Sequence, residues 1–132
     1  MFIDANVFVS AWLGRDRRAQ RCQEFIEKVE LGEQRASTSV LVFDEVLHKL
    51  ETHTGDREKS AAVIKKLSAI PYLKVYEVTP RQLNASLVIF TEYKMSPRDS
   101  LHVSTMLENG VEKILSYDKD FDSVKGIKRI EP

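Results

Sequence analysis

The chain has little cysteine, no long apolar run and no excess of charge of either sign. Cys22 is the single cysteine among 132 residues, so one chain can form neither an internal disulfide nor a cysteine-based zinc cluster. No apolar stretch reaches the roughly 20 residues that cross a membrane. The first residues also lack a basic region followed by a long apolar run, so a secretory signal is not expected. These absences favour a cytoplasmic protein.

Several catalytic motifs are missing as well. The chain has no glycine-rich phosphate loop, no serine in a nucleophile elbow and no His-Glu-x-x-His pattern. Its histidines, His48, His53 and His102, are expected on the surface or in packing. The formal net charge is zero, with 20 Lys and Arg against 20 Asp and Glu, which argues against a uniformly basic surface for nucleic acid. Acids gathered in one site would nevertheless leave a basic remainder.

Strand-like and helix-like segments alternate along the whole chain. The expected strands cover residues 1–4, 35–38, 73–78, 113–117 and 127–130, and the expected helices cover 7–13, 16–31, 40–50, 56–70, 80–93 and 97–108. Thr79-Pro80 and Ser96-Pro97 each place a capping residue before a proline at the first helical position. Leu83, Leu87 and Phe90 recur on one apolar face of a helix. This alternation predicts one α/β domain with a parallel sheet flanked by helices.

Four acids stand where a carboxylate is unusual or chemically useful. Asp4 ends the first strand, and Asp118 follows the fourth. Glu45 interrupts an apolar helix, where an unpaired buried charge would be costly, and Asp99 lies in the first turn of the last helix. Ligands of open parallel sheets bind beyond the carboxyl ends of the strands. We therefore expect the four acids to converge at that edge.

Each acid also has an ordinary structural explanation. Asp4 is a good N-cap for the helix that follows it. Asp99 stands three residues after Ser96, as in a capping box. Glu45 and its neighbour Asp44 could both lie at the solvent edge of their helix. Taken one at a time, these explanations are sufficient.

Taken together, the acids require cations. Two unit negative charges about 4 Å apart repel by roughly 4 kcal/mol at an effective dielectric constant near 20. A site with oxygen ligands only suits Mg²⁺ or Mn²⁺. Such a centre can convert bound water to hydroxide and stabilise a displacement at phosphorus. The sequence therefore predicts a metal-dependent phosphoester hydrolase.

The order and spacing of four segments resemble the PIN domain family and, within it, the VapC-type toxin ribonucleases. The segments are Phe2-Ile3-Asp4-Ala5-Asn6, Phe43-Asp44-Glu45-Val46, Pro97-Arg98-Asp99-Ser100-Leu101-His102 and Leu115-Ser116-Tyr117-Asp118-Lys119-Asp120-Phe121. The resemblance covers essentially the whole chain. It implies a single PIN-like domain over residues 1–132, a three-layer α/β/α sandwich around a five-stranded parallel sheet. It also implies an endoribonuclease that cleaves single-stranded RNA with Mg²⁺ or Mn²⁺, acts as the toxin of a type II toxin–antitoxin pair, binds a cognate antitoxin and forms a homodimer.

The resemblance further implies roles for individual residues. Asp4, Glu45, Asp99 and Asp118 would be the catalytic acids and metal ligands. A second set would support them: Asn6 and Ser116 by orienting carboxylates, and Asp120 as an accessory ligand. Asp44 and Asp122 remain open as replacements for their neighbours. The basic residues expected to contact RNA are Arg15, Arg17, Arg18 and Arg98.

Two other functions remain open. A haloacid-dehalogenase-like phosphatase also places an aspartate after its first strand, but it needs a second aspartate two residues later, where this chain has Asn6. A non-catalytic PIN domain that binds RNA or protein is the other alternative. Such domains usually lose site acids, whereas all four positions are filled here.

Overall fold

Five short parallel strands form one sheet at the centre of the protein. In the computed structural model, which describes residues 1–132, the strand order is β3-β2-β1-β4-β5, and all neighbouring strands run parallel. The strands are β1 (Phe2–Ile3), β2 (Ala36–Ser39), β3 (Leu73–Tyr76), β4 (Lys113–Leu115) and β5 (Lys128–Ile130). The chain winds outward from β1 in one direction and returns to its other side with β4. The strand order therefore reverses between β1 and β4, which is where ligands of such sheets bind.

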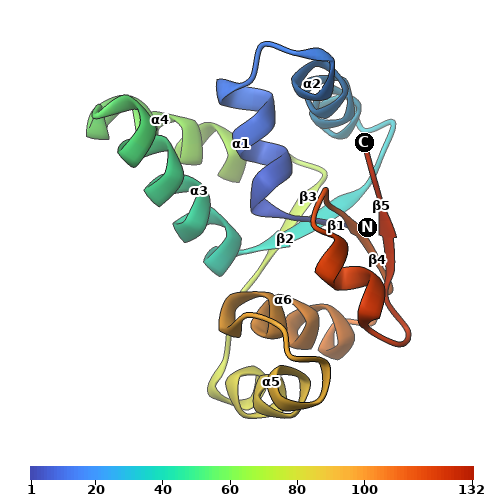
Figure 1. The fold of residues 1–132 in the computed structure, drawn as a ribbon. Helices are drawn as coiled ribbons and strands as arrows, with labels where there is room; N and C mark the ends of the chain where they lie inside the picture. Colours follow the sequence, from blue (N-terminus) through green and yellow to red (C-terminus); the bar gives the residue numbers. More distant parts are fainter.

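Helices cover both faces of the sheet. They are α1 (Ala5–Leu13), α2 (Arg17–Glu30), α3 (Val40–Thr54), α4 (Arg57–Ser68), α5 (Pro80–Tyr93) and α6 (Pro97–Glu108), with a 3₁₀ helix, η1 (Lys119–Ser123), before the last strand. Figure 1 shows α1 to α4 on one side of the strands and the α5–α6 pair on the other. This arrangement confirms the predicted three-layer α/β/α sandwich with a five-stranded parallel sheet. No helix is long and apolar enough to cross a membrane.

The core is continuous from one helical layer to the other. Phe2 is fully buried and faces His102 of α6, with ring centroids 6.1 Å apart. In the opposite layer, Phe8 of α1 meets Phe43 of α3 edge to face at 5.9 Å. The short first strand is thereby held from both sides, and the residue that follows it has a fixed position.

The ends of the helices follow local signals. The predicted caps of α5 and α6 are present: Thr79 and Ser96 each accept a backbone hydrogen bond from the third residue of the helix. The helix α3 runs past its predicted end at residue 50 to Thr54. It stops at Gly55, whose positive φ of 67° is the left-handed conformation that favours glycine.

The apolar face of α5 is not the face that packs against the rest of the protein. Leu83, Leu87 and Phe90 are 52%, 55% and 42% exposed, whereas Gln82 and Ser86 are buried. Two small hydroxyl residues explain the difference, because Ser86 and Ser104 allow α5 and α6 to approach closely. Ser104 donates a 2.8 Å hydrogen bond to the carbonyl of Gln82. Periodicity identified an apolar face correctly, but the neighbouring helix covers a different one.

Candidate active site

Asp4 lies at the reversal point of the sheet and is held by three hydrogen bonds. It follows β1, caps α1 and is only 5% exposed. Its carboxylate accepts hydrogen bonds of 2.6 Å each from the backbone N–H of Ala5, the side-chain amide of Asn6 and the hydroxyl of Ser116. Burial raises the pKa of Asp4, although these donors oppose the shift. The result is a desolvated carboxylate in a fixed orientation.

Asn6 and Ser116 join the ends of β1 and β4 into one network. The Ser116 hydroxyl accepts hydrogen bonds of 2.9 Å from the Asn6 amide and from the backbone N–H of Asp118. The Asn6 side-chain carbonyl accepts a 3.3 Å hydrogen bond from the backbone of Tyr117. Both residues therefore contact the Asp4 carboxylate, and the role in orienting it that the family resemblance implies stays a prediction.

Glu45 points inward from α3, and Asp44 does not. The Glu45 side chain is 14% exposed, and its carboxylate lies 2.6 Å from Nζ of Lys49 and 3.6 Å from Nε2 of His102. The close approach of His102, reinforced by Lys49, lowers the pKa of Glu45 to about 2. Asp44 is exposed, so the structure separates the two adjacent acids and favours Glu45 as the site residue.

His102 is a site neighbour that sequence reasoning missed. It is fully buried, and neither ring nitrogen has a hydrogen-bond partner. Three residues separate it from Asp99 along α6, a spacing that places both side chains on one face of a helix. That spacing was a usable signal, but His102 was predicted only as a surface or packing residue. Its position beside Glu45 instead puts a buried imidazole, 3.6 Å from the Glu45 carboxylate but without a hydrogen bond, next to the acids.

Asp99 and Asp118 complete the group from the other side. Asp99 lies in the first turn of α6, where its backbone N–H donates to the Ser96 hydroxyl at 3.1 Å and its carboxylate accepts from that hydroxyl. Burial raises the pKa of Asp99, and the charges of Asp118 and Glu45 add to the effect. Asp118 caps η1 and accepts a 2.9 Å hydrogen bond from the backbone of Asp120. The capping explanations for Asp4 and Asp99 are therefore correct, and both residues also face the acid group.

Asp120 and Asp122 are both exposed and play different parts. The two carboxylate oxygens of Asp122 accept hydrogen bonds of 2.9 and 3.0 Å from the Arg129 guanidinium. The carboxylate of Asp120 has no ion pair with the protein, and its backbone contacts Asp118. Because both carboxylate oxygens of Asp122 bind Arg129, Asp122 is a poorer candidate for a metal ligand than Asp118. Asp120 has no such partner and stays a candidate accessory ligand.

The four acids share one edge but do not form a closed cluster. No three acidic or histidine side chains already converge on one point at metal-binding distance. Each carboxylate has turned to a local donor: Asp4 to Asn6 and Ser116, Glu45 to Lys49 and His102, Asp99 to Ser96, and Asp118 to the backbone of Asp120. The donor set is made of oxygens, and burial and repulsion disfavour the charged forms of Asp4 and Asp99, so a hard divalent cation fits the site.

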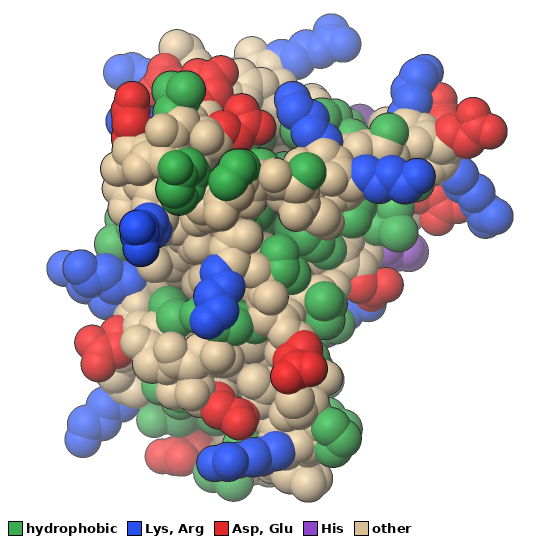
Figure 2. All heavy atoms as spheres, turned by 180° about the vertical axis from the view of Figure 1, so that it is seen from behind, with side chains coloured by type: hydrophobic (Ala, Val, Ile, Leu, Met, Phe, Trp, Pro, Cys, Tyr) green, Lys and Arg blue, Asp and Glu red, His purple; other side chains and the backbone are tan.

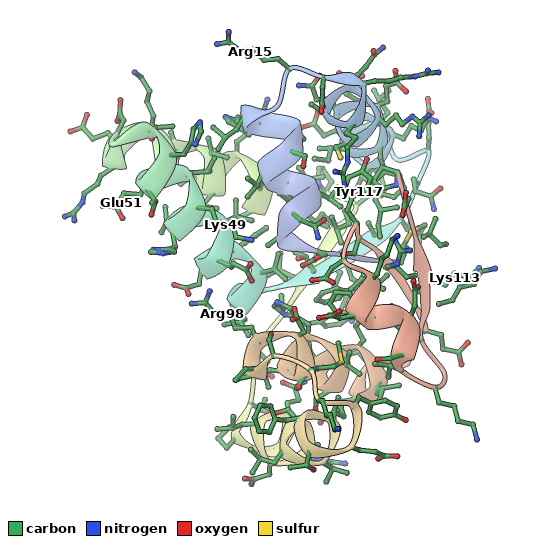
Figure 3. The ribbon with its side chains drawn as sticks, in the orientation of Figure 1. Arg15, Lys49, Glu51, Arg98, Lys113 and Tyr117 are labelled. Carbon is green, nitrogen blue, oxygen red and sulfur yellow. The ribbon has the colours of Figure 1, made fainter.

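The predicted RNA-contacting arginines lie at different distances from this edge. Figure 3 shows Arg98 at the opening between α3 and α6, whereas Arg15 projects from the far end of α1. Arg18 stacks its guanidinium 3.7 Å above the ring of Tyr117, the residue between Ser116 and Asp118. Arg17 is exposed at the start of α2. Arg98 and Arg18 are therefore close to the acids, and Arg15 is not.

Comparison with known proteins identifies the family to which this chain belongs. The PIN domain family model matches residues 1–127, and the chain belongs to the PIN domain family. It is similar to ribonuclease VapC13 of Mycobacterium tuberculosis, with 25% identity over 108 residues and 82% of each chain covered. A VapC ribonuclease of Mycobacterium bovis matches equally well.

Solved structures show the same fold. The M. tuberculosis toxin VapC20, described as cleaving the sarcin-ricin loop, superimposes with a TM-score of 0.80 and 17% identity over 99% of this chain and 98% of that one. Rickettsia felis VapBC2, solved bound to a DNA fragment from its promoter, gives a TM-score of 0.72 and 12% identity over 98% and 96% of the two chains.

Proposed function

We propose that the protein is a Mg²⁺- or Mn²⁺-dependent endoribonuclease that cleaves single-stranded RNA. The observation that supports the proposal is the anchored carboxylate of Asp4 at the reversal point of the sheet, close enough to Glu45 for the Glu45 charge to act on its pKa. A buried acid held by three donors and coupled to other acids is typical of a functional site. The similarity to VapC ribonucleases supports RNA as the substrate.

Within the candidate site, the acidic residues would bind a cation and the basic residues would bind RNA. Asp4, Glu45, Asp99 and Asp118 would hold the divalent cation, with Asp120 as an accessory group. When bound, the cation supplies Lewis acidity for activating water and for offsetting charge on the phosphate. Asn6 and Ser116 keep the Asp4 carboxylate oriented.

Arg98 lies in the first turn of α6, on the side of α3, and is exposed. Its guanidinium can bind a phosphate oxygen of the incoming strand. Lys49 lies beside Glu45 and is 43% exposed, so it adds positive charge on the α3 side. These two cations would bind and orient the phosphodiester between α3 and α6.

Cleavage of total RNA tests the proposal. Purified protein with Mg²⁺ or Mn²⁺ should cut RNA at defined positions, and EDTA should stop the reaction. Asp4→Asn should remove the activity. The matched control is Asp16→Asn, because Asp16 is the exposed N-cap of α2 and asparagine caps helices equally well. If Asp4→Asn cuts as fast as the unmodified protein, the site assignment is wrong. Hydrolysis of a phosphomonoester without RNA cleavage would point to the phosphatase alternative.

The biological setting follows from the relatives. We propose that the protein is a cytoplasmic toxin held inactive by a cognate antitoxin, because its relatives carry VapC names and structural neighbours are VapBC complexes. A small reading frame beside the gene, whose product copurifies with the protein and blocks cleavage, is the expected result. A gene without such a neighbour would contradict the toxin role and leave the nuclease proposal intact. The homodimer stays a prediction, and a monomer in light scattering would contradict it.

A further inference from the structure

A hollow lies at the edge of the sheet opposite the acids. It has a volume of about 630 Å³, and its lining includes Met1, Arg35, Ser37, Tyr72, Lys74 and Tyr76. Arg35 and Tyr72 immediately precede β2 and β3, so the hollow opens where these strands begin. The register pairs Phe2 with Ser37 and Ser37 with Lys74. Since Phe2 faces α6, the hollow lies on the sheet face that α6 covers at β1 but leaves open at β2 and β3.

The lining is positively charged and contains no acid. Arg35 and Lys74 are exposed, and neither forms an ion pair with the protein. Ser37, only 5% exposed, donates a single long hydrogen bond of 3.5 Å to the carbonyl of Met1. A buried hydroxyl with one weak partner and two cations without an ion pair together suit an anion with several oxygens, such as a phosphate.

Two tyrosines give the hollow flat apolar walls. The Tyr72 ring lies against Gly32, where an added Cβ would come within 2.7 Å of the ring. Tyr72 remains 45% exposed in this fixed position. The Nζ atom of Lys74 lies over the ring of Tyr76, 4.9 Å from its centroid. Figure 2 shows the molecule from behind, where Lys and Arg side chains lie among hydrophobic and acidic ones.

We propose that this hollow binds a nucleotide unit of single-stranded RNA, with the phosphate at Arg35, Lys74 and Ser37 and the base stacked on Tyr72. A positive groove combined with exposed aromatic rings is how proteins bind single strands without reading their sequence. An acidic peptide would also pair with Arg35 and Lys74, but its binding would not require the exposed ring of Tyr72. The inference depends on the proposed function only in naming RNA as the strand.

The site would hold RNA away from the point of cleavage. Asp4 follows the end of β1, whereas Arg35 and Tyr72 precede the starts of β2 and β3. A β-strand of four residues is about 13 Å long. RNA bound in the hollow would therefore have to extend over several nucleotides to reach the acids. Short RNA fragments would then reach the acids but not both sites, which makes substrate length part of the protein's selectivity.

RNA binding in EDTA separates this site from catalysis. A labelled single-stranded oligouridylate is titrated with the full-length protein while cleavage is blocked. Tyr72→Leu should weaken binding about tenfold, and Tyr72→Phe should bind normally because the ring remains. Arg35→Gln/Lys74→Gln should lower the slope of log affinity against log salt by about 1.4. The charge-matched control is Lys28→Gln/Lys65→Gln, from exposed positions on α2 and α4 that form no ion pair. Thermal melting checks that each variant is folded.

Photocrosslinking with 4-thiouridine should place the RNA on the peptide that contains Tyr72. The inference fails if Tyr72→Leu binds normally, if the Arg35/Lys74 pair loses no more affinity than its control, or if an acidic peptide displaces the RNA and binds Tyr72→Leu equally well. Cleavage assays run in parallel distinguish the two proposals. Crosslinking at Tyr72 without any cleavage would support this site and contradict the ribonuclease, whereas cleavage with unchanged binding in these variants would contradict only this site.

Discussion

The two ends of the same sheet carry opposite charges. Its carboxyl edge gathers Asp4, Glu45, Asp99 and Asp118, whereas its amino edge carries Arg35, Lys74 and Lys113. Figure 3 shows Lys113 projecting away from the opening where Arg98 lies. Parallel strands produce this separation, because residues that end strands meet at one edge and residues that begin them meet at the other. A net charge of zero therefore hides two regions of opposite sign.

The two edges also differ in how firmly their side chains are held. Asp4 is 5% exposed and accepts three hydrogen bonds, while Arg35 and Lys74 are exposed and have no ion pair. Chemistry requires fixed groups, since small displacements of reacting atoms are costly. Binding of a flexible strand tolerates mobile cations. The comparison agrees with the proposed catalysis at the carboxyl edge and the proposed RNA binding at the amino edge.

The largest effect should come from the two adjacent acids on α3. Glu45→Gln should lower RNA cleavage more than about a hundredfold, because a direct ligand should matter more than the supporting groups, which cost about 10–100-fold. Asp44→Asn should leave cleavage within about twofold, since Asp44 is exposed. Initial rates on one RNA measure both variants. Equal losses, or no loss in Glu45→Gln, would remove the distinction between inward and outward acids.

Metal binding should stabilise the protein in a pH-dependent way. At a concentration a hundred times the dissociation constant, Mn²⁺ should add about 2.7 kcal/mol to the free energy of unfolding. Burial raises the pKa of Asp4 and of Asp99, so both protonate sooner than ordinary aspartates as pH falls and release the cation. Without metal, stability should fall as pH rises from the ordinary aspartate pKa through these raised values, because the folded state holds the protons more tightly.

Thermal melting with and without Mn²⁺, at about pH 7.5 and about pH 5, measures this effect. The shift in melting temperature should shrink at acidic pH. Arg35→Gln/Lys74→Gln should show the same Mn²⁺ shift as the unmodified protein, because the two edges act separately. A shift that is equal at both pH values, or that vanishes in this double variant, would contradict the assignment.

A smaller effect is expected from Ser116. Its hydroxyl donates to Asp4 and accepts from Asn6 and Asp118, so Ser116→Ala should lower cleavage about tenfold. The variant should also lose about 1 kcal/mol of unfolding free energy for the missing hydrogen bonds. The control is Ser123→Ala, which removes an exposed hydroxyl bonded only to the Asp120 carbonyl. Cleavage by Ser116→Ala at the normal rate would show that Asp4 does not need this support.

The smallest effect should come from His102. Since its buried ring nitrogens form no hydrogen bond and their polar contact is the 3.6 Å approach to Glu45, His102→Leu should change the free energy of unfolding by only about 1 kcal/mol. Cleavage should still fall several-fold, because Glu45 loses the imidazole 3.6 Å away. Chemical denaturation and rate measurements separate the two quantities. A large loss of stability with an unchanged rate per folded molecule would make His102 a packing residue only.

Much of the fold could be predicted because its signals are local. The caps at Thr79 and Ser96 and the alternation of strands and helices predicted the layers and the parallel sheet. The covered face of α5 could not be predicted, since periodicity locates an apolar stripe without saying which neighbour packs against it. Leu83 and Leu87 are exposed for that reason.

Candidate members of the site could be proposed from the sequence, but their contacts could not. Strand ends placed Asp4 and Asp118 at one edge, and the family resemblance selected Glu45. The position of the buried imidazole of His102 depends on the packing of α6 against β1 and α3, which involves residues far apart in the sequence. The capture of Asp122 by Arg129 likewise becomes visible only when β5 lies beside η1.

The position of a bound Mn²⁺ ion tests the central claim most directly. Crystals grown with Mn²⁺ and measured at a wavelength where manganese scatters anomalously should show the ion between Asp4, Glu45, Asp99 and Asp118, with direct ligand distances of about 2.1 Å. The same experiment with Asp4→Asn should show little or no signal there. An ion bound elsewhere, or no ion in protein that cleaves RNA, would contradict the account.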